Sequence, residues 1–371
     1  MSDTKQAILY SRSAVVQDWK CPRARFWNYE YLGRGISPAT TALELFLGIT
    51  MHDGLAALAH GLDIDAIVDA AKSQLRGTLL ANTLPDDHEA QYFAEEQCAL
   101  VEGLLRGYYK QVWPGFCKQY PEIVLVEQEV TYQHDYLTFM AKPDLVVRDT
   151  EGCLWYIEYK TTSTNKEQWI NSWATAVQLH SSVRAVESFL GEKVTGVVVQ
   201  GLYKGYVSYD KQSSPFCYAY HKPAEPPFIK SVWSYEYRAG LKKYPIWLKP
   251  GGVKEWVANM PEGLLSQQFP QVPPIFCNQH LIDTFFAQRG RRESDIRLAR
   301  DTISDPECSP EARQRLLDIV FPQHWEQCNP SFGRSCSYLK LCHGSCAEPL
   351  NAGFTLRESH HELERQQHDC I

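Results

Sequence analysis

The sequence contains no apolar run long enough to cross a membrane, and its first residues lack the apolar stretch of a secretory signal peptide. Long polar low-complexity tracts are also missing, and charged residues make up an ordinary 22% of the 371 positions. These absences argue against a membrane-embedded or disordered protein and predict a globular, cytoplasmic one. The length is sufficient for a full hydrophobic core in one large domain or two small ones.

A positive net charge is absent as well. The formal charge is -7 at pH 7, which argues against indiscriminate wrapping of nucleic acid, because such binding neutralises many phosphates. Binding of nucleic acid would have to use a local basic channel. The densest basic patch falls in an expected helix over Asn278–Arg300, which is either a solvated helix face or a wall that tracks phosphates. Its arginines are Arg289, Arg291, Arg292, Arg297 and Arg300.

Cysteine, by contrast, is plentiful. Twelve cysteines in a protein of a reducing compartment predict buried thiols and metal ligands rather than disulfides. Cys328, Cys336 and Cys342 lie in a compact segment with few apolar residues. Three thiolates leave a tetrahedral site one ligand short, and either Cys346 nearby or the distant Cys21 would complete it. Zn²⁺ and a [4Fe–4S] cluster satisfy the same cysteine geometry.

One hairpin concentrates polar groups on a single face. Strands rich in Val, Ile, Leu, Tyr and Trp are expected over Leu137–Arg148 and Cys153–Thr161. A three-residue turn that ends in Gly152 joins them, because glycine tolerates the left-handed conformation that this turn requires. The resulting register places Asp144 opposite Glu158. Since side chains alternate across a strand, one face carries Asp144, Glu158 and Lys160, and the other carries Trp155, Ile157 and Tyr159.

Two carboxylates and an ammonium group on one patch suit phosphodiester chemistry. Mg²⁺ is commonly held by one or two carboxylates, and a bound ion activates water and clamps the oxygens of a phosphodiester. A lysine two residues from a metal ligand orients the nucleophile or offsets charge on the phosphate. The alternative is an ordinary solvated hairpin face, because Pro-Asp and Glu-x-Lys are common pairs.

The remaining elements are expected from apolar periodicity. His52 lies on or beside the apolar face of the first expected helix, where it is either a satisfied core residue or a metal ligand. An aromatic and basic run over residues 23–31 either stacks bases or forms a core helix. We expect helices over Ala42–His60, Ile64–Leu79, His88–Trp113 and Trp169–Leu190, and strands over Glu122–Tyr132, which pairs with Leu137–Arg148, and Val194–Tyr203.

Several motifs follow one another in a family-like order: Gly48-Ile-Thr-Met-His52, Lys142-Pro-Asp144, Glu158-Tyr-Lys160 and Gln178. In this order they resemble the PD-(D/E)xK nuclease superfamily, and within it the RecB-like branch, which includes the RecB and AddB nuclease domains and the CRISPR spacer-acquisition exonucleases. The family pattern Gln-x-x-x-Tyr is only half present, because Ser182 stands at the Tyr position.

The cysteines extend this resemblance to both ends of the chain. Cys21-Pro-Arg near the start, with Cys328, Cys336 and Cys342 near the end, resembles the split iron–sulfur signature of the RecB-like branch. The resemblance runs from about Ser13 to Cys346 and is poor over residues 205–277. It implies that Cys21 is the fourth ligand and that a [4Fe–4S] cluster, rather than zinc, staples the two ends together.

The resemblance implies an α/β fold with a restriction-endonuclease-like core, in which helices flank a central mixed sheet and both chain ends form an iron–sulfur lobe. We expect a single nuclease domain over residues 1–348, with a family-specific insertion at about 205–277. Residues 349–371 are expected to form a polar, mobile tail.

The resemblance also implies a role for each site residue. Asp144, Glu158 and His52 would bind Mg²⁺ or Mn²⁺, Lys160 would assist the attacking water, and Gln178 would position it. An acidic residue of the preceding strand can approach the metal in this family, but we expect Glu127 and Glu129 to face solvent. The implied activity is metal-dependent hydrolysis of DNA, by an exonuclease that prefers single strands or a free end. The alternatives are a non-cutting DNA-binding scaffold of the same fold and a zinc-stapled interaction protein.

Overall fold

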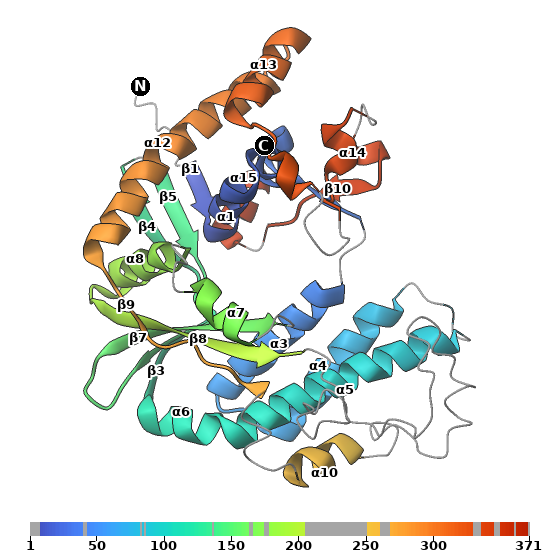
Figure 1. Cartoon of the computed structure of the whole chain (residues 1–371), viewed down its shortest axis with the longest axis vertical. Coiled ribbons are helices and arrows are strands. Elements are labelled where there is room, and N and C mark those ends of the chain that lie inside the picture. The colour runs from blue at the N-terminus through green and yellow to red at the C-terminus, as the bar shows by residue number, and fades with distance from the viewer. Residues whose placement is uncertain are drawn as a thin grey trace.

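A computed structural model describes residues 8–39, 43–81, 84, 87–135, 137–162, 166–173, 178–204, 251–259, 268–328, 335–344, 349–359 and 361–369. They form three sheets with helices around them (Figure 1). Among these residues, no helix is both long and apolar enough to cross a membrane.

The central sheet has five strands in the order β3-β6-β7-β8-β9. β7 (Leu154–Thr162) and β8 (Val194–Tyr203) run parallel at its centre, whereas the outer pairs are antiparallel, so the sheet is mixed as expected. Both central strands are rich in β-branched and aromatic residues, which suits strands that are buried on both faces. The other strands are β3 (Glu122–Val126), β6 (Leu145–Arg148) and β9 (Ile275–Phe276).

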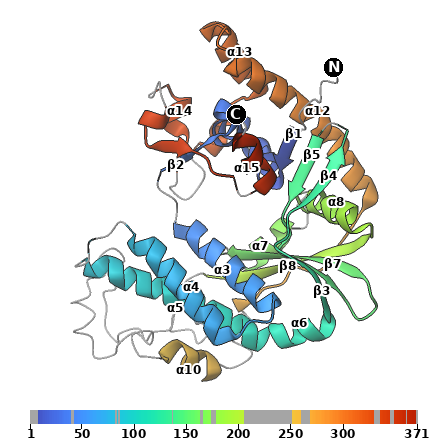
Figure 2. The same cartoon turned by 180° about the vertical axis from the view of Figure 1, so that it is seen from behind.

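Helices cover both faces of this sheet (Figures 1 and 2). The face that carries Ile157 and Tyr159 packs against a layer of helices and forms the first hydrophobic core with it. This layer comprises α3 (Leu43–Ala59), α4 (Ile64–Leu80), α5 (His88–Gln111), α6 (Trp113–Gln119) and α10 (Gly252–Asn259). The opposite face, with Tyr156, packs against α7 (Lys166–Trp173), α8 (Gln178–Leu190) and α12 (Gln279–Ser304). The expected helices that correspond to α3, α4 and α5 are confirmed to within two residues at each end.

Two strands that the sequence predicts to be continuous are each broken in two. The expected strand Glu122–Tyr132 is β3 followed by β4 (Val130–His134), and the expected strand Leu137–Arg148 is β5 (Leu137–Ala141) followed by β6. β3 pairs with β6 in the central sheet, whereas β4 pairs with β5 in a second sheet of order β1-β5-β4. β1 (Ile8–Ser11) runs parallel to β5.

The two breaks lie side by side and have a local cause. Pro143 has no N–H to donate to a ladder, so it interrupts the strand between β5 and β6. Glu127 has a φ of 46°, in the left-handed region, and so ends β3. The Glu127 N–H donates to the Asp144 carbonyl at 3.1 Å, which joins the two breaks. The segments β3–β4 and β5–β6 therefore pass from one sheet to the other at the same point.

Both ends of the chain meet in a separate lobe (Figure 1). β2 (Ile36–Pro38) pairs antiparallel with β10 (Phe354–Leu356), and Phe26, only 3% exposed, packs on Phe321 at 5.1 Å between ring centres. For the aromatic and basic run over residues 23–31, the prediction that it belongs to the core is therefore confirmed at Phe26. The lobe's helices are α1 (Arg12–Lys20), α2 (Pro22–Arg25), α13 (Pro310–Val320), α14 (Leu339–Cys342) and α15 (Glu362–Asp369).

The last residues differ from the expected polar tail, because they form secondary structure. β10 covers β2, and α15 follows it. Arg357 and Ser359 are buried between these elements, and both side chains contact the Glu364 carboxylate. The polar composition therefore serves local hydrogen bonds within the lobe.

The expected insertion at 205–277 is described only in part, as α10 and residues 268–277. Within it the sequence also predicts strand-like pieces around Phe216–His221 and Ile229–Tyr237, and both lie outside the described residues.

Candidate active site

The hairpin has the register that the sequence predicts. Leu145 pairs with Ile157 and Arg148 with Leu154, and one further step along the same ladder brings Asp144 level with Glu158. Gly152 closes the turn with a φ of +82°, which only glycine adopts without strain. The alternation is confirmed too, because Ile157 and its neighbour Tyr159 enter the core beneath α3–α6 whereas Glu158 contacts the Tyr156 hydroxyl on the opposite face.

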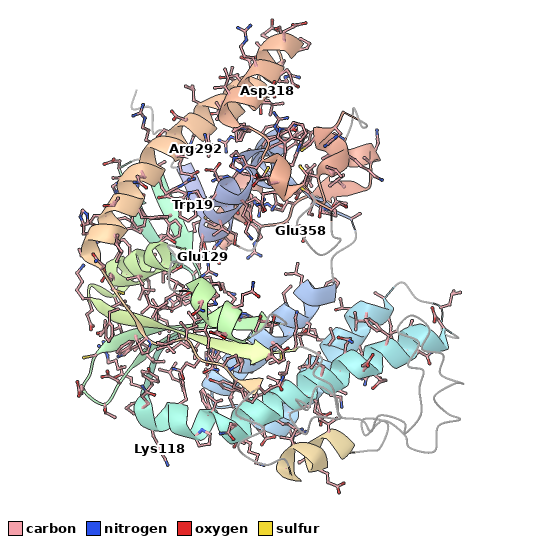
Figure 3. All side chains as sticks on the ribbon, viewed as in Figure 1. Trp19, Lys118, Glu129, Arg292, Asp318 and Glu358 are labelled. Carbon is pink, nitrogen blue, oxygen red and sulfur yellow. The ribbon has the colours of Figure 1, made fainter. Side chains whose placement is uncertain are left out.

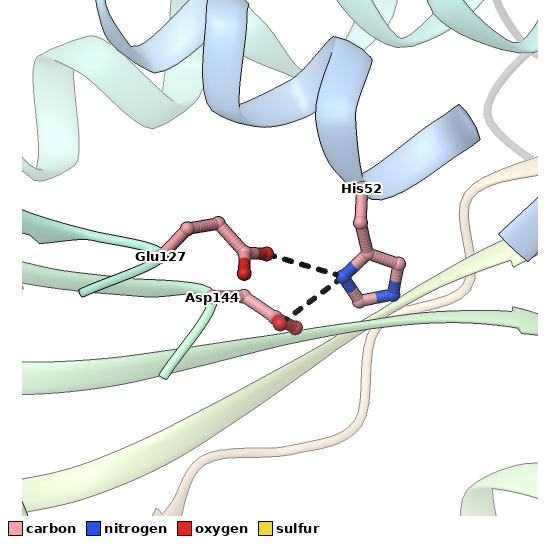
Figure 4. Close-up of side chains that lie close together, drawn as sticks. All are labelled: His52, Glu127 and Asp144. Atoms are coloured by element: carbon pink, nitrogen blue, oxygen red, sulfur yellow. Dashed lines mark hydrogen bonds and ion pairs between the residues drawn. The ribbon is translucent and has the colours of Figure 1, made fainter. Parts of the chain in front are cut away.

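Three side chains with metal-binding atoms converge at the break between the two sheets (Figure 4). His52 comes from α3, Glu127 follows β3, and Asp144 precedes β6. The His52 Nδ1 lies 3.1 Å from Asp144 Oδ1 and 3.5 Å from Glu127 Oε1, and one ligand atom from each residue lies within 4.8 Å of the others. A histidine and two carboxylates of this spacing are suitable ligands for a hard divalent cation.

Backbone contacts fix this group in place. The second oxygen of Asp144 accepts a hydrogen bond from the Tyr159 N–H at 2.6 Å, so the carboxylate is tied to the neighbouring strand. The second oxygen of Glu127 contacts the Lys142 ammonium at 3.0 Å. The expectation that Glu127 faces solvent is wrong, because its side chain is three-quarters buried between His52 and Lys142. Glu129 contacts His361 and the N–H of Glu362, near the start of α15.

The carboxylates also control the charge of His52. Burial lowers the pKa of His52, but the nearby Asp144 carboxylate and the hydrogen bonds to Asp144 and Glu127 outweigh burial and raise it to about 9. The imidazole is therefore a cation at neutral pH, and its positive charge offsets the two carboxylates. A metal ion bound by the same group would take the place of this proton, because a histidine ligand must be neutral.

Glu158 lies beside this group and is almost fully buried, at 1% exposed. Its Oε1 contacts the Arg12 guanidinium at 2.8 Å and the Lys160 ammonium at 2.5 Å, and its Oε2 accepts a hydrogen bond from the Tyr156 hydroxyl. Burial raises the pKa of Glu158, but Arg12 and Lys160 reverse that effect and hold it well below the usual range. Glu158 is thus an anion at neutral pH, next to Lys160 as predicted.

Two of these contacts could not be found from the sequence. Arg12 lies 146 positions before Glu158, in α1, and no motif connects the two residues. Tyr156 belongs to the strand that carries Glu158, but its alternation alone does not distinguish an apolar core residue from a hydrogen-bond donor.

These residues occur in a stretch that a protein-family comparison identifies. Residues 11–211, more than half of the chain, match the model of the PD-(D/E)XK nuclease superfamily. The chain belongs to that superfamily. A search of the curated proteins found no match. The matched range holds His52, Asp144, Glu158, Lys160 and Gln178, and ends within the poorly resembling region that begins at residue 205.

Gln178 is the first residue of α8. Its side chain and residues 174–177 lie outside the described part of the chain. The role of Gln178 and the continuity of the expected helix Trp169–Leu190 both stay predictions.

The four cysteines of the resemblance line one cavity of about 150 Å³ in the lobe of the chain ends. Cys21 comes from the end of α1, whereas Cys328, Cys336 and Cys342 come from a segment more than 300 residues later. Burial raises the pKa of the Cys328, Cys336 and Cys342 thiols. Cys346 lies outside the described residues.

The arginines of α12 do not form a uniform phosphate-tracking wall. Arg289 is buried and contacts Asp18 and Glu293, and Arg292 contacts Asp18 at 2.8 Å, where α12 passes alongside α1 (Figure 3). Arg25 contacts Glu293 at 2.6 Å and Glu30 at 2.9 Å. We refer to these buried ion pairs as the arginine network, which consists of Asp18, Arg25, Glu30, Arg289, Arg292 and Glu293. It joins α1 and α2 to α12, so these arginines have a structural role.

Proposed function

We propose that this PD-(D/E)XK protein is a metal-dependent deoxyribonuclease, an exonuclease of the RecB-like branch that acts on single-stranded DNA or a free end. The observation that carries the proposal is the convergence of His52, Glu127 and Asp144 beside the Glu158–Lys160 pair. The donors fit Mg²⁺ or Mn²⁺, because both ions accept carboxylate oxygens and Mn²⁺ also accepts imidazole. Glu158 completes the proposed ligand set.

Each residue then has a chemical role. The bound ion supplies an activated water and neutralises charge on the phosphodiester. Asp144 and Glu127 hold His52 in a fixed orientation. The Lys160 ammonium is 30% exposed and lies 2.5 Å from Glu158 Oε1, and in this proposal it donates to the attacking water. In this proposal the Gln178 amide helps to position the water.

The cutting assay compares isosteric variants. We expect Asp144→Asn and Glu158→Gln to lose Mg²⁺- and Mn²⁺-dependent cleavage of a labelled single-stranded oligonucleotide, because each loses the negative charge that holds the ion. Glu151→Gln is the matched control, since Glu151 is an exposed carboxylate in the turn of the same hairpin. Comparable metal-dependent cleavage by Asp144→Asn and the wild type would disprove the assignment.

Substrate form is a separate test. An exonuclease needs an end, so circular single-stranded DNA should resist digestion under conditions that degrade the linear form. Duplex DNA with blunt ends should be degraded more slowly than single strands. Equal cleavage of circular and linear DNA would show an endonuclease and refute the exonuclease proposal while leaving the metal site intact.

We also propose that the four cysteines hold a [4Fe–4S] cluster. The four thiols line one cavity of about 150 Å³, which Cys21 reaches from the other end of the chain. Four thiolates can hold either zinc or a cluster, and the resemblance of the cysteine spacing to the RecB-like branch supports the cluster.

Metal content tests the cluster. Anaerobically purified Cys21→Ala and Cys336→Ala should both lose iron and acid-labile sulfide, whereas Cys346→Ala should retain them. Cys98→Ala is the control, because Cys98 is a buried thiol in the helical core far from this cavity. Iron retained in Cys21→Ala and lost in Cys346→Ala would replace the two-ended site with a local one. Stoichiometric zinc in the wild type would remove the iron–sulfur proposal.

A further inference from the structure

Arg12 is a cation that the nuclease motifs do not include, yet it contacts the buried Glu158 directly. Its Nη1 lies 2.8 Å from Glu158 Oε1 and donates to the Tyr156 hydroxyl at 3.4 Å. Glu158 Oε1 thus faces two cations, Arg12 and Lys160, although one carboxylate can neutralise only one. Glu158 and its two cationic partners therefore carry an excess of positive charge beside the proposed metal site.

The guanidinium has donors that no described residue uses. Both contacts of Arg12 use Nη1, and no partner among the described residues occupies its Nη2 or Nε. A quarter of the side chain is exposed, compared with 1% of Glu158. Nε and Nη2 form the planar fork of donors that matches the oxygens of a phosphate.

The helix that carries Arg12 is firmly held, so the fork has a fixed position. Arg12 opens α1 directly after Ser11, which pairs with Met140 in the second sheet and accepts a hydrogen bond from the Ala14 N–H. Asp18, one and a half turns along α1, is held by Arg289 and Arg292 of the arginine network. A donor fixed in this way loses little freedom when it binds a substrate.

From this geometry we propose that Arg12 is a catalytic residue that contacts the phosphate to be cleaved. The proposal rests on the proposed nuclease function. When the substrate phosphate reaches the metal site, the Nε and Nη2 donors of Arg12 bind its non-bridging oxygens, and Lys160 remains with Glu158. The excess charge beside Glu158 then stabilises the additional negative charge that develops on the phosphate during attack.

Arg148 is a matched control. It is on the hairpin that carries Glu158, and its side chain is 23% exposed, compared with 25% for Arg12. Its fork is already used, because Nη1 and Nη2 contact the two oxygens of Glu192 at 2.8 and 2.9 Å. A general effect of removing a half-buried arginine would appear in both variants, whereas a phosphate contact would appear only at Arg12.

The experiment is a single-turnover cleavage assay at saturating Mn²⁺ and oligonucleotide. Arg12→Ala should slow cleavage about 100-fold or more, because loss of one donor to a transition-state oxygen has effects of this size. Arg12→Lys should recover little, since an ammonium lacks the fork. Methylguanidinium at millimolar concentration should accelerate Arg12→Ala but not Arg148→Ala, with tetramethylammonium as the ionic-strength control. The Mn²⁺ dissociation constant, measured by titration calorimetry without DNA, should change less than threefold.

Three results would overturn the proposal: an Arg12→Ala rate within threefold of wild type, a loss fully explained by weaker Mn²⁺ binding, or a large loss without methylguanidinium rescue. If Arg12→Ala does not fold, Arg12→Gln replaces it, since its amide can still donate to Glu158. Wild-type cleavage rates in Arg12→Gln, or misfolding of both variants, would make Arg12 a structural partner of Glu158 and refute the phosphate contact.

Failure of the nuclease function has a different signature. If the wild type binds the oligonucleotide in Ca²⁺ but does not cleave it with Mg²⁺ or Mn²⁺, the proposed function fails. Arg12→Ala should then still weaken Ca²⁺-dependent binding about tenfold, which would support the phosphate contact in a non-cutting scaffold. Unchanged binding in Arg12→Ala would refute that contact.

Discussion

The candidate active site and the arginine network are built from the same residue types, but they differ in how their cations are used. In the arginine network, Arg25, Arg289 and Glu293 are all less than 5% exposed. Arg25 contacts Glu293 of α12, and Arg289 contacts Asp18 of α1 and Glu293 of its own helix. In the candidate active site Asp144 and Glu158 are buried, whereas Glu127 and Arg12 are about a quarter exposed and Lys160 and Lys142 are more exposed still. Except at Arg292, whose side chain is 27% exposed, the arginine network is closed to solvent, whereas the candidate site is most open at its two lysines.

This difference has a physical meaning. A buried charge without a partner is costly, so the network stabilises the contact between α1 and α12 only while it is complete. The active site instead keeps cations at the surface and holds carboxylates at fixed positions beneath them. Such an arrangement can exchange partners when a metal ion or a phosphate arrives, without the need to rebuild the core. The network thus fixes the position of α1, and α1 carries Arg12 into contact with Glu158 of the candidate site.

The largest effect is expected from a substitution in the candidate active site, which should abolish cleavage with little loss of stability. Asp144→Asn should reduce metal-dependent cleavage more than 1,000-fold, since activation of water by the metal accounts for a large part of such catalysis. Its thermal midpoint should change by only a few degrees, because the amide keeps the volume of the carboxylate. Single-turnover rates and calorimetric melting of the same preparation test both parts. A large loss of stability would show that this site, too, is structural.

The opposite result is expected in the arginine network. Glu293→Gln should lower the free energy of unfolding by about 3 kcal/mol, because the buried anion that Arg25 and Arg289 share is lost and each arginine keeps only one carboxylate partner, Glu30 or Asp18. The cleavage rate per folded molecule should stay within threefold of wild type. Urea unfolding and active-fraction measurements are the readouts. Loss of activity with unchanged stability would contradict the separation of the two regions.

Much of the fold and part of the site could be predicted because their signals are local. Alternation and the Gly152 turn determine the hairpin register, which is why the sequence alone places Asp144 beside Glu158. Apolar periodicity predicts α4 closely, since its buried residues Ile67, Val68, Ala71 and Leu75 form one continuous stripe. The spacing of the late cysteines indicates a shared site, and the structure places Cys21 at the same cavity.

The errors arise where distant segments decide the outcome. Pro143 alone does not reveal that β5 and β6 belong to different sheets, because that depends on which strands are available as partners. Glu127 appears solvent-facing in an alternating strand, but the break at its positive φ turns it toward His52. For the α12 arginines the sequence leaves a solvated face and a phosphate-tracking wall equally open, because their acidic partners, Asp18 and Glu30, lie more than 250 positions away in the sequence.

Acid should weaken the arginine network in a defined pH window. Burial raises the pKa of Asp18 and Glu293, but hydrogen bonds and charge from Arg292 and Arg25 outweigh burial and lower both below their usual values. Because the folded pKa is the lower one, the stabilisation is present above the unfolded value of about 4 and is lost as the pH falls below it. The difference in unfolding free energy between wild type and Glu293→Gln should therefore shrink as the pH falls below about 4. An advantage that grows in acid would contradict this sign.

The smallest effect is expected at an exposed ion pair that resembles the network in geometry alone. Arg148 makes a two-pronged contact with Glu192, as Arg25 does with Glu293, but Glu192 is half exposed. Water replaces much of what the pair loses, so Arg148→Ala should melt within about 2 °C of wild type. Even that small difference should disappear in concentrated salt, because exposed charges are screened. A shift as large as that of Glu293→Gln would mean that fork geometry, rather than burial, determines the strength of these pairs, and the distinction between the two regions would have to be drawn differently.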